Sequence, residues 1–233
     1  MGTRQDGIAR KQEILEAALS LFERIGYENT TVQNILDEVG IGKGTFYHHF
    51  SSREEVLDNI VDENIESVQR ILEAVAEDTS LTAIEKLRKL IVSVQNYRNR
   101  NTARRFALIR ILMREENHTL AYKYTERVVE QTLDLYTKVI AQGNEESIFD
   151  APYPRKTAEM IIRMGNHFRG QIEKMKEQVS SVADSRREAR EHEISEIIGF
   201  MHIMTVRMLG IPAETLDITS MLTQTGSLEE PQT

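Results

Sequence analysis

Residues 39–56 read VGIGKGTFYHHFSSREEV, and this stretch decides how the whole chain is interpreted. Two glycines precede a segment, about Lys43 to Phe50, that is long enough for only about two helical turns. Phe46 and Phe50 are four residues apart and share one face of such a helix. Because so short a helix is marginal by itself, we expect the two rings to anchor it against neighbouring helices.

The opposite face of this short helix is expected to be exposed. At about 100° per residue, Gly44 and His48 point nearly opposite Phe46, and Thr45 and Tyr47 flank them. The segment contains no acidic residue. A slim helix with small, aromatic and hydrogen-bonding groups fits the major groove of DNA. The stretch therefore predicts a helix that reads DNA.

The composition is that of an ordinary globular protein, with 233 residues and a net charge of −8. The absence of Cys excludes disulfides and thiolate metal sites. Neither a signal peptide nor an apolar run of about 20 residues is found, so we expect a cytoplasmic protein that binds no membrane. Residues 1–60 contain 6 Lys and Arg against 10 Asp and Glu, so a DNA contact must come from a local cluster of charge.

The residue combinations needed for catalysis or metal binding do not occur together. His48 and His49 point about 100° apart on a helix, which disfavours chelation of one ion. HExxH and GxGxxG motifs are absent, and the single ExxH, Glu115–His118, has no second copy. We therefore expect no enzyme activity, no metal and no cofactor. The alternative to DNA binding is a helical adaptor or scaffold, which the acidic N-terminal part favours.

The remainder of the chain has the apolar period of helices and only four prolines, which predicts an all-α fold of about nine to ten helices. Thr30–Gln33 and Ser52–Glu55 match capping boxes that begin helices, and Gly143 is expected to end the seventh helix. The expected domains are a three-helix DNA-binding domain at 1–55, a second helical domain at 56–224 whose first helix bridges both, and a flexible tail at 225–233.

Three stretches resemble the helix-turn-helix signature of the TetR-type bacterial regulators: Thr30–Val32, Val39–Phe50 and Ser52–Glu55. The resemblance covers residues 8–60 and implies a ligand-responsive transcriptional regulator, most often a repressor. Such a protein binds a palindromic operator in double-stranded DNA as a homodimer and is released by a small-molecule effector.

The resemblance also assigns roles to individual residues near the short helix. Thr31 and Arg53 are expected to hold phosphates from helix N-termini, where backbone amides and the helix dipole favour anions. Tyr47 and His49 are expected to contact mostly the DNA backbone. The residues expected to face base edges are Lys43, Gly44, Thr45 and His48, the last in place of an aromatic residue common in the family.

Dimerisation is expected because one short helix reads few base pairs, whereas two copies about a two-fold axis read a palindrome. The eighth and ninth helices have regular apolar seams that can form a four-helix bundle with a second subunit. The resemblance implies the same interface, although the seams can instead face the subunit's own core. The expected interface residues are Ile161, Gly165, Phe168, Ile172, Ile194, Ile198, Met201 and Thr205.

Two features suggest an effector that is apolar and carries an anionic group. The later helices are rich in Met and aromatic residues, and residues 86–114 contain nine Lys and Arg but no acid. The Met-rich positions can instead be core. The arginines of the basic stretch can instead form a solvated surface or pair with Glu13, Glu16 and Glu23 of the first helix; these arginines are Arg98, Arg100, Arg104 and Arg105. The candidate effector contacts are Tyr97, Arg104, Arg105, Met113, Tyr136, Met164, His167, Phe168, Met201 and Met204.

Overall fold

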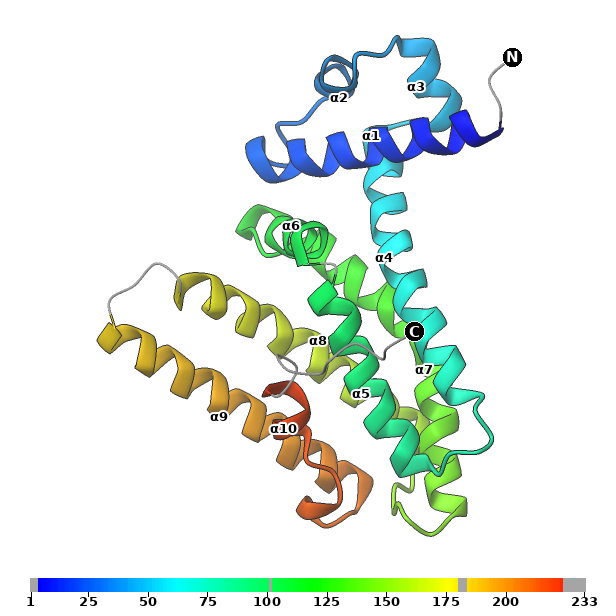
Figure 1. The fold of residues 1–233 in the computed structure, drawn as a ribbon, viewed down its shortest axis with the longest axis vertical. Coiled ribbons are helices and arrows are strands. Elements are labelled where there is room, and N and C mark those ends of the chain that lie inside the picture. Colours follow the sequence, from blue (N-terminus) through cyan, green and yellow to red (C-terminus); the bar gives the residue numbers. More distant parts are fainter. Residues whose placement is uncertain (1–3, 101, 180–183, 224–233) are drawn as a thin grey trace, which may run out of the picture. The chain divides into compact units, whose positions relative to one another are not determined.

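The computed structural model describes residues 4–100, 102–179 and 184–223, and every regular element in these ranges is a helix (Figure 1). The all-α prediction is therefore confirmed. The helices are α1 (Arg4–Ile25), α2 (Val32–Val39), α3 (Lys43–His49), α4 (Arg53–Ala76), α5 (Ala83–Arg100), α6 (Thr102–Leu112), η1 (Glu115–Asn117), α7 (His118–Glu145), α8 (Pro154–Val179), α9 (Asp184–Leu209), η2 (Ala213–Thr215) and α10 (Ile218–Thr223).

The chain divides into two compact units that differ from the expected domains. The first comprises Met1–Ser67 and Asn101–Tyr124, and the second comprises Val68–Arg100 and Thr125–Thr233. The first unit therefore includes α6, because α6 packs against α1. Each of the helices α4 and α7 contributes to both units. The expected tail at 225–233 lies outside the described residues.

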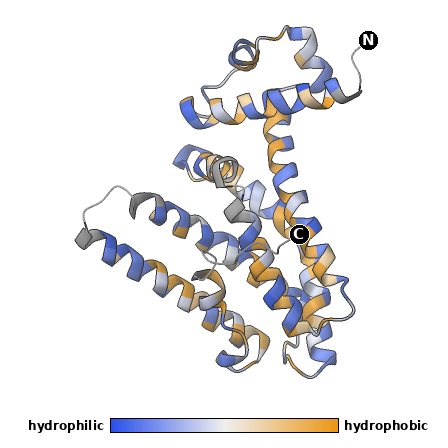
Figure 2. Ribbon diagram, viewed as in Figure 1, coloured by the Kyte–Doolittle hydropathy of each residue, from blue (hydrophilic) through white to orange (hydrophobic). Residues whose placement is uncertain are grey.

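The core of the first unit forms where the apolar faces of α1 to α4 and α6 meet. Figure 2 shows hydrophobic and hydrophilic positions alternating along these helices, as their amphipathic period requires. In α1, Leu15 and Leu19 are buried and Ala17 is half-buried. The fully enclosed large side chains are Ile14, Leu15, Phe22, Ile35, Phe46, Phe50, Ile60, Ile65 and Ile111.

The second unit is built around α8 and α9, which pack against each other, and α10, which packs against α5 and α9. Its core is aliphatic, with Leu87, Leu90, Ile140 and Leu209 nearly or completely buried. The prediction that α7 ends at Gly143 is wrong. The helix continues to Glu145, and Gly143 is buried where any side chain would overlap the ring of Phe149.

Among the described residues, no single helix has both the length and the apolar character needed to cross a membrane. The helical segments Arg187–Leu209 and Ala213–Leu222 have the required length and apolar character only when they are taken together, and they are bent by 104° where they join.

Candidate nucleic-acid interface

Thr31 caps the N-terminus of α2 and leaves that helix end exposed. Its hydroxyl oxygen accepts from the Asn34 amide (3.2 Å), and the Asn34 side-chain oxygen accepts from the Thr31 amide (2.9 Å). The expected capping box is therefore displaced by one residue from Thr30–Gln33. Thr30 is instead buried, and its hydroxyl donates to the Gly26 carbonyl (2.7 Å). An exposed, capped helix start of this kind attracts anions.

The turn between α2 and α3 depends on Gly40, whose φ of 72° lies in the left-handed region that glycine adopts without strain. Its amide donates to the Leu36 carbonyl (2.9 Å) and ends α2. The chain then enters α3, which Phe46 and Phe50 anchor with 0% and 1% exposure and ring centroids 6.0 Å apart. The expected orientation of the short helix is confirmed.

The opposite face of α3 is open to solvent. Tyr47 is 56% exposed, although its ring edge still contacts Phe46 at a centroid distance of 5.4 Å. The remaining exposed residues on this face are Lys43, Gly44, Thr45 and His48. The space around Gly44 is empty to at least 4 Å, so another molecule can approach the backbone there. Six of the eight predicted DNA contacts, these five and Thr31, are thus exposed.

His49 is half-buried beside two cations of α1 that the sequence interpretation missed. Partial burial first, and then the charges of His48, Lys11 and Arg10, lower the pKa of His49 below 6.5. The Lys11 ammonium lies 5.8 Å from the centre of the Phe50 ring, which places it at the end of α3. No local motif marks Lys11, because only the packing of α1 against α3 brings it there. Lys11 adds positive charge next to the reading helix, whereas the Arg10 guanidinium is paired with the Glu13 carboxylate.

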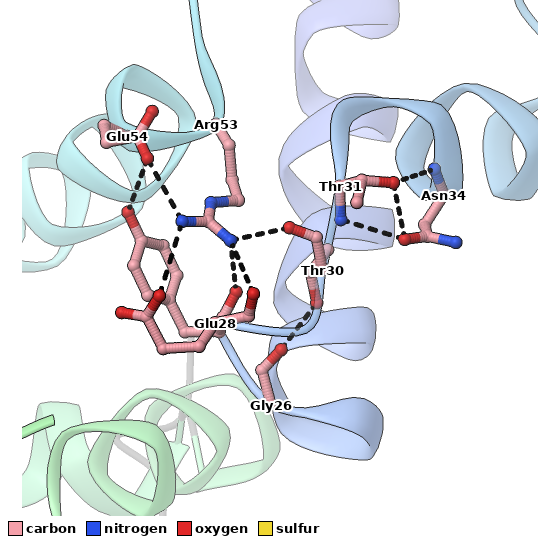
Figure 3. Close-up of polar contacts among 8 residues, drawn as sticks. Gly26, Glu28, Thr30, Thr31, Asn34, Arg53 and Glu54 are labelled. Atoms are coloured by element: carbon pink, nitrogen blue, oxygen red, sulfur yellow. Dashed lines mark hydrogen bonds and ion pairs between the residues drawn. The ribbon is translucent and has the colours of Figure 1, made fainter. Parts of the chain in front are cut away.

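Arg53 has contacts that differ from the phosphate contact implied by the resemblance (Figure 3). Its guanidinium donates to the carbonyls of Tyr27 and Thr30, each at 2.7 Å, and its side chain is 19% exposed. The capping box expected at the start of α4 is also modified. The Ser52 hydroxyl accepts from the Glu55 amide (3.1 Å), but the Glu55 carboxylate accepts from the Ser51 amide rather than that of Ser52.

Comparison with known proteins finds two family models that match this chain. The model of the bacterial regulatory proteins of the tetR family matches residues 14–60, which contain α2, the turn and α3. The model of the tetracyclin repressor-like C-terminal domain matches residues 111–185. The chain belongs to the tetR family. It is therefore a DNA-binding transcriptional regulator and not an enzyme.

Individual relatives extend the similarity over most of the chain. The HTH-type transcriptional regulator YfiR of Bacillus subtilis is 26% identical over 167 residues, 70% of this chain and 80% of the relative. The HTH-type transcriptional repressor KstR2 of Mycobacterium tuberculosis is 28% identical over 145 residues, 60% of this chain and 70% of the relative. The solved structure of Salmonella enterica GusR superposes with a TM-score of 0.62, covering 89% of this chain and 98% of that one at 18% identity, which supports the fold.

The apolar seams of this tetR-family chain are only partly available to a second subunit. Ile194, Ile198 and Thr205 of α9 are buried within the single chain, and their assignment to a dimer interface stays a prediction. The half-buried expected residues are Ile161, Gly165, Phe168, Ile172 and Met201. The sequence interpretation missed the exposed apolar side chains Met160, Phe200 and Ile203, because the seam of α9 that faces its own core has the same period.

The predicted effector contacts belong to both compact units. Met113 belongs to the first unit, and His167 is exposed and lies 3.0 Å from the Gln171 side chain. Phe168 of α8 contacts Phe200 of α9 at a ring distance of 5.6 Å. The half-buried members are Tyr97, Tyr136, Met164, Phe168, Met201 and Met204, whereas the side chains of Arg104 and Arg105 lie outside the described residues.

The basic stretch at 86–114 serves several intramolecular contacts. Lys86 is buried and donates to the Ala76 carbonyl (2.7 Å) and the Gln142 side chain (2.8 Å). At the other end of the stretch, Arg110 pairs with the Glu23 carboxylate (2.7 Å) and Arg114 donates to the Glu23 carbonyl (2.5 Å). Ion pairing with the first helix thus occurs through Arg110 of α6.

Proposed function

We propose that this chain is a repressor that binds an inverted-repeat operator as a homodimer and is released by a small apolar effector. The observation that carries the proposal is the division of α3 into a buried Phe46–Phe50 face and an exposed face of small, aromatic and basic groups. Because two such helices about a two-fold axis occupy major grooves about 34–36 Å apart, the operator half-sites should be separated by about one helical turn.

Selection of bound fragments from random DNA tests operator binding, palindromy and spacing together. We expect enrichment of an inverted repeat, and we expect Tyr47→Ala to abolish the enrichment. A helical adaptor that does not bind DNA predicts no enriched sequence and no effect of the substitution. Enrichment of a single half-site would support DNA binding but would contradict binding as a homodimer.

The exposed apolar side chains of α8 and α9 support the homodimer. Phe200 is 50% exposed, and Met160 and Ile203 are also exposed large apolar residues on these two packed helices. An apolar patch of this kind marks an interaction surface. Phe200→Glu should give monomers in sedimentation velocity, because an unpaired carboxylate is costly to bury. Tyr153→Glu, at a more exposed apolar residue just before α8, is the matched control and should remain dimeric.

Polar atoms inside the second unit support an effector that makes a few hydrogen bonds. The side-chain atoms Gln131 Oε1, Asn166 Nδ2 and His202 Nδ1 are buried without a hydrogen-bond partner. A buried polar group of this kind is costly unless another group satisfies it. KstR2 of Mycobacterium tuberculosis, described as a ketosteroid transcriptional regulator, superposes on 82% of this chain with a TM-score of 0.53. We therefore infer a mostly apolar effector with polar ends.

An anionic group on the effector requires a cation that is not already engaged. Lys86, Arg88 and Lys89 bind the Ala76 carbonyl, the Thr215 carbonyl and the Asp78 carboxylate, respectively. Thermal shift with a steroid ketone, a steroid carboxylic acid and decanoate tests the chemical class. We expect the steroids to raise the melting temperature and to lower operator affinity, and Asn166→Leu to remove both effects. Equal responses of Asn166→Leu and wild type would reject this site.

A further inference from the structure

Arg53, the first residue of α4, binds the loop that connects α1 to α2. One guanidinium nitrogen, Nη1, donates to the carbonyls of Tyr27 (2.7 Å) and Thr30 (2.7 Å), and more weakly to that of Glu28 (3.2 Å). The planar group also lies over the Tyr27 ring, 4.2 Å from its centre. Figure 3 shows these loop oxygens gathered around the guanidinium. A single side chain thus binds three carbonyls of one loop that lie outside any helix.

Two carboxylates complete the surroundings of Arg53. Its Nη2 atom donates to Glu54 Oε1 (3.2 Å) and lies 3.8 Å from Glu28 Oε2. Glu54 Oε1 also accepts from the Tyr27 hydroxyl (3.4 Å). Both carboxylates are themselves well exposed, so they neutralise the cation from the solvent side. A phosphate that approached the guanidinium would meet these two negative charges first.

The loop that Arg53 holds leads directly into the N-terminus of α2. Thr30, whose carbonyl accepts from Arg53, is completely buried and is followed by Thr31, the exposed cap of α2. Gly26 at the other end of the loop has a φ of 91°, so the chain reverses there without help from a side chain. The contacts of Arg53 therefore hold the loop from which α2 presents the Thr31 hydroxyl.

We propose that Arg53 is a positioning residue for DNA binding, which orients the Thr31 end of α2 and does not itself contact phosphate. This inference rests on the proposed operator binding. Lysine should not replace Arg53 in this role. The planar guanidinium can hydrogen-bond to several carbonyls and stack on the Tyr27 ring at the same time, whereas a compact ammonium group cannot.

Salt dependence of operator affinity separates positioning from phosphate contact. Each phosphate neutralised by a cation contributes a slope of about −0.9 to log K against log[salt]. We expect Arg53→Gln and Arg53→Lys to weaken operator binding at least about tenfold, equally, with the wild-type slope. A phosphate contact predicts the opposite pattern: a slope shallower by about one unit in Arg53→Gln, and near wild-type affinity and slope in Arg53→Lys. That pattern would overturn the proposal.

A double-mutant cycle tests whether Arg53 acts through Thr31. In a Thr31→Val background the loss of affinity caused by Arg53→Lys should shrink to a few-fold, because the Thr31 hydroxyl that Arg53 positions is already gone. A merely structural Arg53 would lower the melting temperature and leave the affinity of the folded protein unchanged. Full additivity of the two losses would also reject the proposal. If Arg53→Gln fails to fold, Arg53→Lys decides both comparisons by itself.

Hydrogen exchange provides a readout that needs no DNA. In Arg53→Lys the amides of residues 27–31 should exchange faster than in wild type, whereas those of α1 residues 14–22 should not change. Unchanged exchange at 27–31 would show that Arg53 does not order the loop. If wild type fails to bind any inverted repeat while the loop exchange changes as expected, the proposed function fails and the structural role of Arg53 stands.

Discussion

Replacing Phe46 with Ala should unfold the reading helix, whereas replacing its neighbour Tyr47 should not. Phe46 has 0% exposure and contacts Phe50, and α3 has only seven residues with which to hold itself in place. Truncation of a buried Phe costs about 3–5 kcal/mol, through lost burial and the cavity that remains. Since a domain is stable by only about 5–15 kcal/mol, Phe46→Ala removes a large fraction of the stability of the first unit.

Tyr47→Ala is the matched control on the same helix. Tyr47 is 56% exposed, so its truncation should change the free energy of unfolding by no more than about 0.5 kcal/mol. We expect it nevertheless to abolish operator binding. Urea denaturation followed by circular dichroism measures the stability, hydrogen exchange of residues 43–50 localises the change, and fluorescence anisotropy with labelled operator measures the affinity.

Two results would refute the reasoning. A loss of less than about 1 kcal/mol in Phe46→Ala would mean that the ring does not anchor α3, because even partial collapse of the cavity leaves the lost transfer free energy. Wild-type operator affinity in Tyr47→Ala would mean that the exposed face of α3 does not contact DNA.

Three further predictions follow from local geometry. Operator affinity should rise as the pH falls from about 8 to about 6. The pKa of His49 is lowered in the free protein and should increase beside a phosphate, so DNA binding takes up a proton. His49→Gln should flatten this rise in anisotropy titrations, and an unchanged profile would exclude a His49 contact. Gly143→Ala should lower the free energy of unfolding of the second unit by about 1–3 kcal/mol, because the added methyl overlaps the Phe149 ring. This cost should exceed the gain in helix propensity. A higher melting temperature of the variant would contradict this packing. Gly44→Ala should instead stabilise α3 by up to about 1 kcal/mol in urea titrations, because the added methyl meets nothing in the protein. The same methyl occupies the DNA-facing surface and should weaken operator binding. Unaltered affinity would show that DNA does not approach there.

Much of the first unit was predictable from local patterns. Phe46 and Phe50 share a face by spacing alone, and Gly40 marks the turn by its left-handed conformation. These predictions succeeded because the relevant interactions connect residues within one helical turn. The cap of α2 was displaced by one position, because Thr30 and Thr31 are equally good caps and only the tertiary burial of Thr30 selects between them.

Predictions of what covers a given helix face were less successful. Ile194 and Ile198 have the spacing of a dimer seam, but the structure buries them within the chain, and the exposed apolar residues lie elsewhere on α8 and α9. Periodicity shows that a face is buried and does not show what covers it. Arg53 illustrates the same limit for charge, because a cation at a helix start suits a phosphate or a set of loop carbonyls equally well.

The amino-acid sequence alone determined the helices, their order, the turn before α3 and the side of α3 that is left exposed, because backbone hydrogen bonds and apolar period act over a few residues. The tertiary structure alone decided the partners of Arg53, the proximity of Lys11 to His49, and the attachment of α6 to α1. Each of these joins residues far apart in the chain, and such contacts depend on how whole helices pack, which no local pattern specifies.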